Sequence, residues 1–194
     1  MFVLVESGSI TKTLSGNKGI TIGDIQYPQN IFTLWTASEK EAIGIYEVVW
    51  DNTNKKDEAY YTNTNQSFDF ADGVATASYG SATAKALADA NATDDDGVEL
   101  DPVVVIEGLK TKHKRIIKNQ ASGLLTPTDW YILKATDVES YSVPSAITTF
   151  RANVRTKSND MEVLIDACST VDELAALYVY TDGTRPLGEF PEAV

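Results

Sequence analysis

The chain has 194 residues, of which 43% are hydrophobic and 23% are charged, and its formal net charge is −12. This length and composition suffice for one domain of ordinary size or for two small domains. The negative charge argues against nucleic acid and anionic membranes as partners, because repulsion must be overcome before any local contact helps. A cationic partner would not meet this repulsion.

The N-terminal sequence MFVLVESGS has no positively charged leader, and Glu6 interrupts its apolar residues, so we expect no secretory signal. No run of about 18 apolar residues occurs, which predicts that the chain does not insert into a membrane. We therefore expect synthesis in a cytoplasm. Cys168 is the only cysteine, which excludes a disulfide within the chain.

Residues 1–80 have the signals of a small antiparallel β domain. Ser7-Gly8-Ser9 predicts a hairpin turn. A helical insert is predicted from Pro28 to Trp35 and again at Ser38, which has the capping-box spacing with Glu41. Gly44 is expected to close this insert. Runs of β-branched and aromatic residues predict strands at 2–5, 10–14, 19–22, 45–50, 59–62 and 66–70.

Residues 81–102 are rich in Ala, Asp, Asn, Thr and Gly, which predicts an acidic, alanine-rich linker between two domains. The run Asp94-Asp95-Asp96 also suggests a calcium loop. However, the alternating oxygen ligands and the glutamate at the twelfth position of such a loop are absent. We therefore interpret this run as a solvated part of the linker.

Residues 103–123 are predicted to form an amphipathic connecting helix. One stripe, spaced by three and four residues, contains Ile106, Leu109, His113, Ile116 and Gln120. The other faces hold a basic cluster of Lys110, Lys112, Lys114, Arg115 and Lys118. This cluster is either a docking surface for an acidic partner, including another copy of the chain, or the solvated face of a packed helix.

Residues 124–180 are predicted to form a bundle of four short helices. Thr126 and Pro127 have the residue types of a helix N-cap and first turn. Pro144 is predicted to begin the second helix, which carries the apolar stripe Ile147, Phe150 and Val154.

Ser158-Asn159 is predicted to interrupt the helix that begins at Pro144. The third helix has an apolar stripe that ends at Cys168, and a capping box of Thr170 and Glu173 begins the fourth. A last strand is expected at 178–180, and residues 181–194 are expected to be a tail. The predicted fold class is thus α+β: a β domain with a helical insert, an acidic linker, a helix and a short-helix bundle.

The supply of reactive side chains is small. His113 is the only histidine, which excludes a catalytic triad and a multi-histidine metal site. Cys168 and His113 remain a candidate thiol–base pair, but Cys168 closes an apolar stripe, where a thiol is usually a small core residue. The glycines have neither phosphate-loop nor dinucleotide-binding spacing. We predict no enzyme activity, no cofactor and no metal.

A carbohydrate-binding site is another alternative, and it would use the three tryptophans Trp35, Trp50 and Trp130. Together with nine tyrosines they could provide stacking faces for a sugar. Core and interface packing is the more usual role of such residues, and we favour it here.

Two groups of residues resemble proteins of tailed bacteriophages. The segment IQYPQNIFTLW at 25–35, followed by EKEAIGIY at 39–46, is similar to the N-terminal part of small tail-associated proteins, especially those of marine phages. The second group resembles the C-terminal helical region of phage tail fibre assembly proteins, and it consists of TDWYIL at 128–133, Val143-Pro144, Phe150-Arg151, Arg155 and VDEL at 171–174.

The resemblance implies a non-enzymatic tail protein that acts in fibre assembly or in the host-recognition apparatus through protein–protein contacts. It implies a tail fibre or another tail protein as the partner and synthesis in the cytoplasm of the host bacterium. Assembly-type family members are chaperones that bind fibre tips, whereas some relatives stay on the virion. A permanent component of the tail, baseplate or fibre is therefore the alternative. A thiol-dependent enzyme is a third interpretation, and a homo-oligomer is left open.

The candidate partner-binding residues are exposed aromatic and basic positions. Tyr131 is chosen because Trp130 and Tyr131 cannot both face one core, and Arg151 and Arg155 because they lie one turn apart beside the apolar stripe. From the basic cluster we add Lys110, Lys114 and Lys118.

Overall fold

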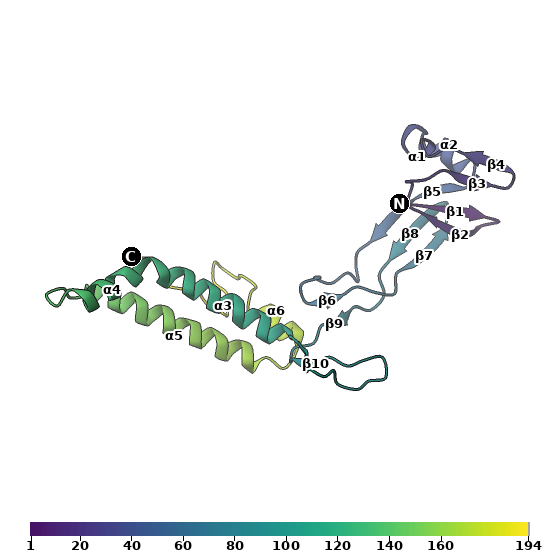
Figure 1. Cartoon of the computed structure of the whole chain (residues 1–194). Helices are drawn as coiled ribbons and strands as arrows, with labels where there is room; N and C mark the ends of the chain where they lie inside the picture. The colour runs from purple at the N-terminus through teal and green to yellow at the C-terminus, as the bar shows by residue number, and fades with distance from the viewer. Residues whose placement is uncertain (194) are drawn as a thin grey trace. The chain divides into compact units, whose positions relative to one another are not determined.

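The computed structural model describes residues 1–193 and divides the chain into two compact units, the first ending at Thr83 and the second beginning at Ala84. Strands predominate in the first unit and helices in the second (Figure 1). The predicted α+β fold class is therefore confirmed.

The first unit is built on a five-stranded sheet with the strand order β2-β1-β5-β8-β7. Neighbouring strands are antiparallel except for β5 and β8, which are parallel. The parallel pair differs from the predicted antiparallel sheet and arises because the chain leaves β5 and returns through the β7–β8 hairpin. The strands are β1 (Phe2–Glu6), β2 (Ser9–Leu14), β3 (Ile20–Ile22), β4 (Ile25–Tyr27), β5 (Ile45–Asp51), β6 (Tyr61–Thr62), β7 (Ser67–Ala71), β8 (Val74–Ser78) and β9 (Thr83–Ala84).

Apolar side chains cover both faces of this sheet. The alternation of side chains along β1 sends Leu4 to one face and Val3 to the other. Leu4 packs in one core cluster with Ile31 and Phe32 of α1 (Ile31–Leu34). The sheet curls so that its edge strands β2 and β7 approach each other, and the second cluster lies on the other face. That cluster contains Val3, Val48, Ala75 and Ala77, with Phe68 and Phe70 packed against it.

The helical insert consists of α1 and α2 (Ala37–Glu41), and its capping box lies on Thr36 and Glu39, not on Ser38 and Glu41 as predicted. Thr36 Oγ1 accepts a hydrogen bond from the Glu39 N–H at 3.3 Å, and the Glu39 carboxylate accepts one from the Thr36 N–H at 2.8 Å. The backbone hydrogen bond from Thr36 lowers the pKa of Glu39. Gly44 closes the insert with a φ of +80°, as predicted.

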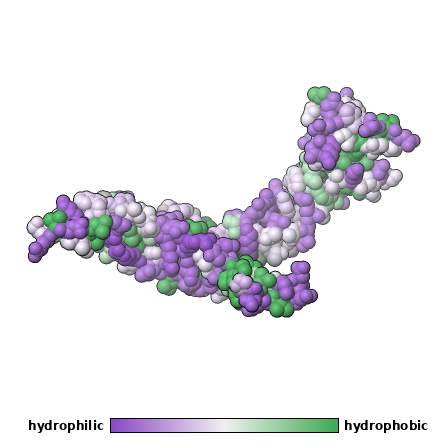
Figure 2. All heavy atoms as spheres, viewed as in Figure 1, coloured by the Kyte–Doolittle hydropathy of each residue, from purple (hydrophilic) through white to green (hydrophobic). Residues whose placement is uncertain are grey.

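The second unit begins with a hairpin in which β10 (Ala90–Asn91) pairs with β11 (Val105–Ile106). Asp94 closes a turn in this hairpin, because its Oδ1 accepts hydrogen bonds from the N–H groups of Asp96 at 3.0 Å and Val98 at 2.9 Å. The segment predicted as a linker at 81–102 therefore contains hydrogen-bonded backbone. Figure 2 shows hydrophobic surface where the hairpin lies, and its exposed aliphatic residues are Val98, Leu100, Val103, Val104, Val105 and Ile106.

The helix α3 (Leu109–Leu125) begins at Leu109 and not at residue 103, because the β-branched residues before it are extended. Gly108 is the N-cap and lies against the backbone of Ala88, where an added Cβ would come within 2.4 Å of the carbonyl. Asp89 fixes this helix start by accepting hydrogen bonds from the Gly108 N–H at 2.8 Å and the Thr111 hydroxyl at 2.9 Å.

Beyond α3 the chain continues through the 3₁₀ turn η1 (Thr126–Thr128) into α4 (Asp129–Asp137). The prediction that Thr126 caps a new helix is wrong. Its hydroxyl donates to the Ser122 carbonyl at 2.8 Å, as it would inside a continuing helix.

The predicted interruption at Ser158-Asn159 is also wrong, because α5 (Ser145–Ala167) is one helix of 23 residues. Ser158 is buried between Val154 and Met161, so the two predicted apolar stripes form one stripe. The predicted capping box of Thr170 and Glu173 is confirmed at the start of α6 (Val171–Ala176).

The helices α3 and α5 lie side by side (Figure 1) and share the core of the second unit. On α3 the buried residues are Leu109, Ile117 and Ala121, whereas Ile116 and Gln120 of the predicted stripe are exposed. In the C-terminal half of α3 the buried stripe is thus displaced by one residue from the predicted stripe. Ala121 packs with Phe150 and Val154 of α5.

The residues after α6 pack back onto this unit. Tyr178, Val179 and Tyr180 lie in a turn and irregular backbone and not in the predicted strand. Leu187 lies within the predicted tail, yet its side chain is fully buried and its N–H donates to the Leu177 carbonyl at 3.0 Å. Phe190 packs against the cluster formed by α3 and α5.

Candidate functional site

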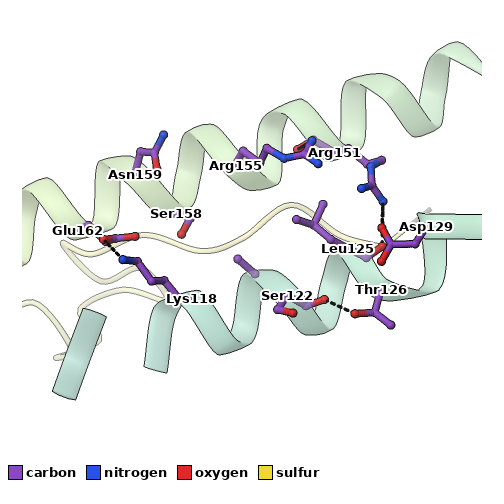
Figure 3. A pocket seen from close by; sticks show the side chains of 11 residues that line it. Lys118, Ser122, Leu125, Thr126, Asp129, Arg151, Arg155, Ser158, Asn159 and Glu162 are labelled. Atoms are coloured by element: carbon purple, nitrogen blue, oxygen red, sulfur yellow. Dashed lines mark hydrogen bonds and ion pairs between the residues drawn. The ribbon is translucent and has the colours of Figure 1, made fainter. Parts of the chain in front are cut away.

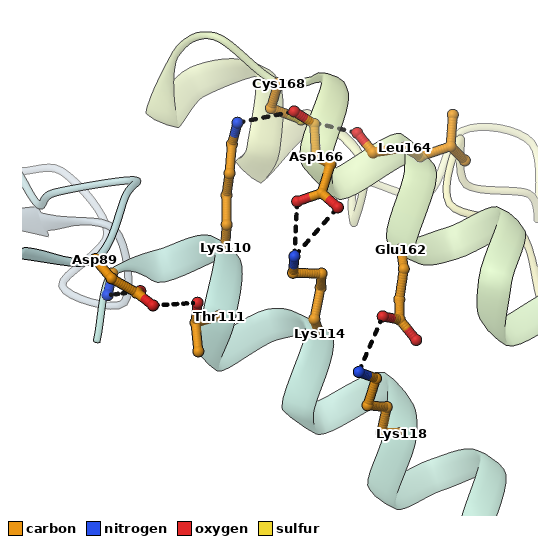
Figure 4. Close-up of polar contacts among 10 residues, drawn as sticks. Asp89, Lys110, Thr111, Lys114, Lys118, Glu162, Leu164, Asp166 and Cys168 are labelled. Carbon is orange, nitrogen blue, oxygen red and sulfur yellow. Dashed lines mark hydrogen bonds and ion pairs between the residues drawn. The ribbon is translucent and has the colours of Figure 1, made fainter. Parts of the chain in front are cut away.

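The three candidate lysines of α3 are engaged by α5. Lys110 Nζ donates to the Asp166 carbonyl at 2.8 Å, Lys114 forms an ion pair with the Asp166 carboxylate at 2.8 Å, and Lys118 pairs with Glu162 at 3.3 Å (Figure 4). The hydrogen bond to Asp166 raises the pKa of Lys114. These contacts are largely exposed, so each stabilises the fold only slightly. The basic cluster is therefore partly neutralised within the chain.

Arg151 was expected to be exposed, and this expectation is wrong because only 8% of its surface is exposed. Its guanidinium donates to the Leu125 carbonyl at 3.0 Å and to the Thr128 hydroxyl at 2.5 Å, and it pairs with Asp129 at 2.7 Å. These bonds satisfy polar groups where α3 passes into η1 and α4, and they tie that junction to α5. Arg151 thus has a structural role in this unit.

A groove of about 460 Å³ lies between α3 and α5 (Figure 3). Arg155 projects from α5 at this groove and is exposed, and its guanidinium donates to the Arg151 carbonyl at 3.4 Å. No carboxylate in residues 1–193 forms an ion pair with it. The lining residues are Lys118, Ala121, Ser122, Leu125, Thr126, Asp129, Arg151, Arg155, Ser158, Asn159 and Glu162.

Next to the groove, α4 has no buried residue. We use the name α4 patch for Trp130 and Leu133, which lie three residues apart on one face of the helix; Ile132 and Val138 are also exposed. Leu133 is 65% exposed and Trp130 is 49% exposed. Tyr131 is half-buried, and its ring centroid lies 3.8 Å from that of Trp130. Lys134 Nζ lies 4.4 Å from the ring centroid of Tyr141 and therefore flanks the patch with a cation.

The structure does not form the candidate thiol–histidine pair. Cys168 is buried, and its Sγ donates to the Leu164 carbonyl at 3.3 Å and makes no hydrogen bond to His113. Burial raises the pKa of the Cys168 thiol, and the Glu173 carboxylate adds to this effect. Nδ1 of His113 lies 2.7 Å from the Tyr178 hydroxyl, and burial lowers the pKa of His113.

The three tryptophans each have a different tyrosine as neighbour. Trp35 meets Tyr27 edge to face with ring centroids 5.9 Å apart, and Trp50 stacks on Tyr79 at 6.0 Å. Trp130 is the one that lies beside the groove residues, next to Tyr131.

Two features are absent from residues 1–193. In this part of the chain no three acidic, histidine or cysteine side chains are grouped so that they could hold a metal ion. Within the same residues, no helix combines the length and the hydrophobicity needed to cross a membrane.

Comparison of the chain with protein-family models, curated protein sequences and solved structures finds no significant match. Of the six candidates, Lys118, Arg151 and Arg155 meet at the groove, whereas Lys110 and Lys114 lie farther along α3 and Tyr131 belongs to α4.

Sequence reasoning missed the partners of the candidate residues. Glu162 and Asp166 have the same spacing of four as Lys114 and Lys118, and this match between two helices was a usable signal. Ser122 and Ser158 had no such signal, because a lone serine in a helix is uninformative.

Proposed function

We propose that this chain is a non-enzymatic protein of a bacteriophage tail that works by binding another tail polypeptide, during fibre assembly or at the host-recognition apparatus. The α4 patch carries the contact part of the proposal. The resemblance of residues 25–46 and 128–174 to tail proteins supports the phage part.

The way in which α4 is stabilised supports a contact at this helix. A nine-residue helix is marginal in water, and most helices gain stability by packing an apolar face. Here α4 has no buried residue, while Trp130, Leu133 and their neighbours face solvent. Tryptophan, tyrosine and arginine are also the residues that most often dominate binding energy. A partner that covers the α4 patch would supply the missing burial.

The experiment uses a phage that carries a tagged copy of the gene. We expect the tagged chain to co-purify with a fibre or tail subunit from infected cells. The double substitution Trp130→Ala and Leu133→Ser should remove that subunit, because it removes the largest apolar surfaces of the patch. Val163→Ser is the matched control, since Val163 is 67% exposed on α5 and lies outside the patch. Equal recovery of the subunit with both proteins would contradict the proposal.

Mass spectrometry of washed virions separates the two forms of the proposal. A fixed stoichiometry in the particle means a permanent tail component, whereas presence in infected cells alone means an assembly factor. Absence of the chain from washed virions, together with absence of any tail protein from the material that co-purifies with it from infected cells, would reject the proposed function.

A further inference from the structure

Side chains of α3 and α5 form ion pairs at two successive positions, and the third position of this series has none. On α3, Lys114, Lys118 and Ser122 follow one another at a spacing of four residues. The two lysines pair with Asp166 and Glu162 of α5. Ser122 is the next residue in this series and lines the groove together with Arg155. By the same register, Ser158 is the α5 residue opposite Ser122, so two serines follow the two ion pairs, and Arg155 lies one turn beyond them on α5 without a carboxylate on α3.

The charges at the groove are consequently unbalanced. Arg151 already pairs with Asp129, and Lys118 pairs with Glu162. Arg155 lies one turn from Arg151 and has no carboxylate partner in the described part of the chain. Two like charges at this spacing disfavour each other. The lining thus has three cations against two carboxylates, in a chain whose net charge is −12.

Ser158 provides a second and independent observation. Its side chain lines the groove, and Figure 3 shows its hydroxyl directed toward the space between the helices. Only 7% of this residue is exposed, and within residues 1–193 its hydroxyl has no hydrogen-bond partner. Since no fully buried side-chain polar atom in the described residues lacks a partner, this hydroxyl reaches the solvent in the groove and can donate a hydrogen bond to a ligand there.

We propose that the groove binds an aspartate or glutamate side chain of an acidic polypeptide segment. The carboxylate accepts hydrogen bonds from Arg155 and Ser158, a combination that a neutral amide does not match because it lacks charge. Ala121 and Leu125 supply an apolar floor for the methylene groups of the side chain. The inference deepens the proposed function, on which it rests, by naming the chemistry of the partner.

The test is a titration of the full-length, ¹⁵N-labelled chain followed by NMR. The probe is a capped hexapeptide with three glutamates, and the matched probe has glutamine at those positions. We expect the glutamate peptide to shift the amide signals around Ser122, Arg155 and Ser158. The glutamine peptide should bind at least about tenfold more weakly, since hydrogen bonds to charged groups are the stronger ones. Equal shifts with both peptides, or shifts elsewhere only, would overturn the inference.

Three variants separate binding from folding. Arg155→Gln should weaken binding of the glutamate peptide at least about tenfold. Ser122→Glu places a carboxylate on α3 within the groove that Arg155 also lines, so it should abolish peptide binding while the thermal midpoint stays equal or rises. Lys112→Gln is the control, because Lys112 is an exposed α3 residue outside the groove, and it should bind like the unmodified chain. Full binding by the Ser122→Glu protein would refute the inference without any question of misfolding.

Inorganic phosphate is the last arm. If phosphate shifts the same signals at the same concentration as the peptide, the groove is a general anion site and the inference is wrong. The proposed function fails separately, through absence of the chain's tail partner in infected cells. A chain that keeps its tail partner but ignores the glutamate peptide would leave the function standing and remove the inference.

Discussion

The sheet of the first unit and the α4 segment of the second differ in how their apolar side chains are covered. In the sheet, each face of β1 packs into its own cluster, so Val3 and Leu4 are both buried. In α4, neighbouring apolar side chains are exposed. The stability of the sheet is therefore contained in the chain, whereas the α4 patch has contacts still to make. Substitutions in the two regions should differ in the same way.

The largest effect is expected in the first unit. Ile45→Ala should lower the free energy of unfolding by about 3 kcal/mol, because Ile45 is fully buried and its removal leaves a cavity. Urea unfolding followed by circular dichroism measures this change. A loss below about 1 kcal/mol would show that the cluster can collapse around the missing atoms.

A smaller loss is expected from Arg151→Met, which removes the hydrogen bonds to Leu125 and Thr128 while keeping an apolar stem. We expect about 2 kcal/mol, since the buried Thr128 hydroxyl loses its donor and Asp129 loses its ion-pair partner. Arg155→Gln is the comparison, and it should change the unfolding free energy by less than about 0.5 kcal/mol. Equal effects of the two substitutions in urea unfolding would contradict the assignment of Arg151 to structure and Arg155 to binding.

The start of α3 should show a modest dependence on pH. The hydrogen bond from the Gly108 N–H, followed by that from Thr111, lowers the pKa of Asp89 in the folded chain. Its stabilising effect is thus present above the unfolded pKa of about 3.9 and is lost as the pH falls through the lower folded value. Asp89→Ala should narrow the difference between urea midpoints measured at pH 6 and pH 3. An unchanged difference would argue against this stabilising role of Asp89.

The smallest effect on stability is expected at the α4 patch. Leu133→Ala should change the unfolding free energy by less than about 0.5 kcal/mol, because Leu133 is exposed. Its effect should instead be measurable as weaker recovery of the tail partner. A loss comparable with that of Ile45→Ala would mean that Leu133 is covered within the chain, and the contrast between the two regions would disappear.

Local signals in the sequence predicted local structure well. The Thr170–Glu173 capping box and the closing glycine Gly44 depend on neighbouring residues, and both are present in the structure. Ser158 was misread because a polar residue in a stripe resembles a break, whereas packing against α3 keeps α5 continuous. Thr36 was missed for a similar reason, since Thr36–Glu39 and Ser38–Glu41 have the same spacing and local rules do not choose between them.

The candidate site was harder to predict from the sequence than the local structure was. The position of Arg155 on a helix was evident, but whether it is paired depends on which α3 residue faces it. That choice follows from the register between two helices, which tertiary packing sets. The burial of Arg151 could not be predicted for the same reason. The carbonyl that it contacts belongs to Leu125 at the end of α3, 26 residues earlier in the chain.

The return of the C-terminal residues onto the helices affects how deletions should be interpreted. Leu187 has no exposed surface, and its backbone is bonded to Leu177. A chain shortened at residue 180 would lose this leucine and Phe190, and it would uncover apolar surface on α3 and α5. Failure of such a shortened protein to bind a partner would therefore report damage to the helical unit. Point substitutions on exposed side chains, with the C-terminus intact, are the informative way to map its contacts.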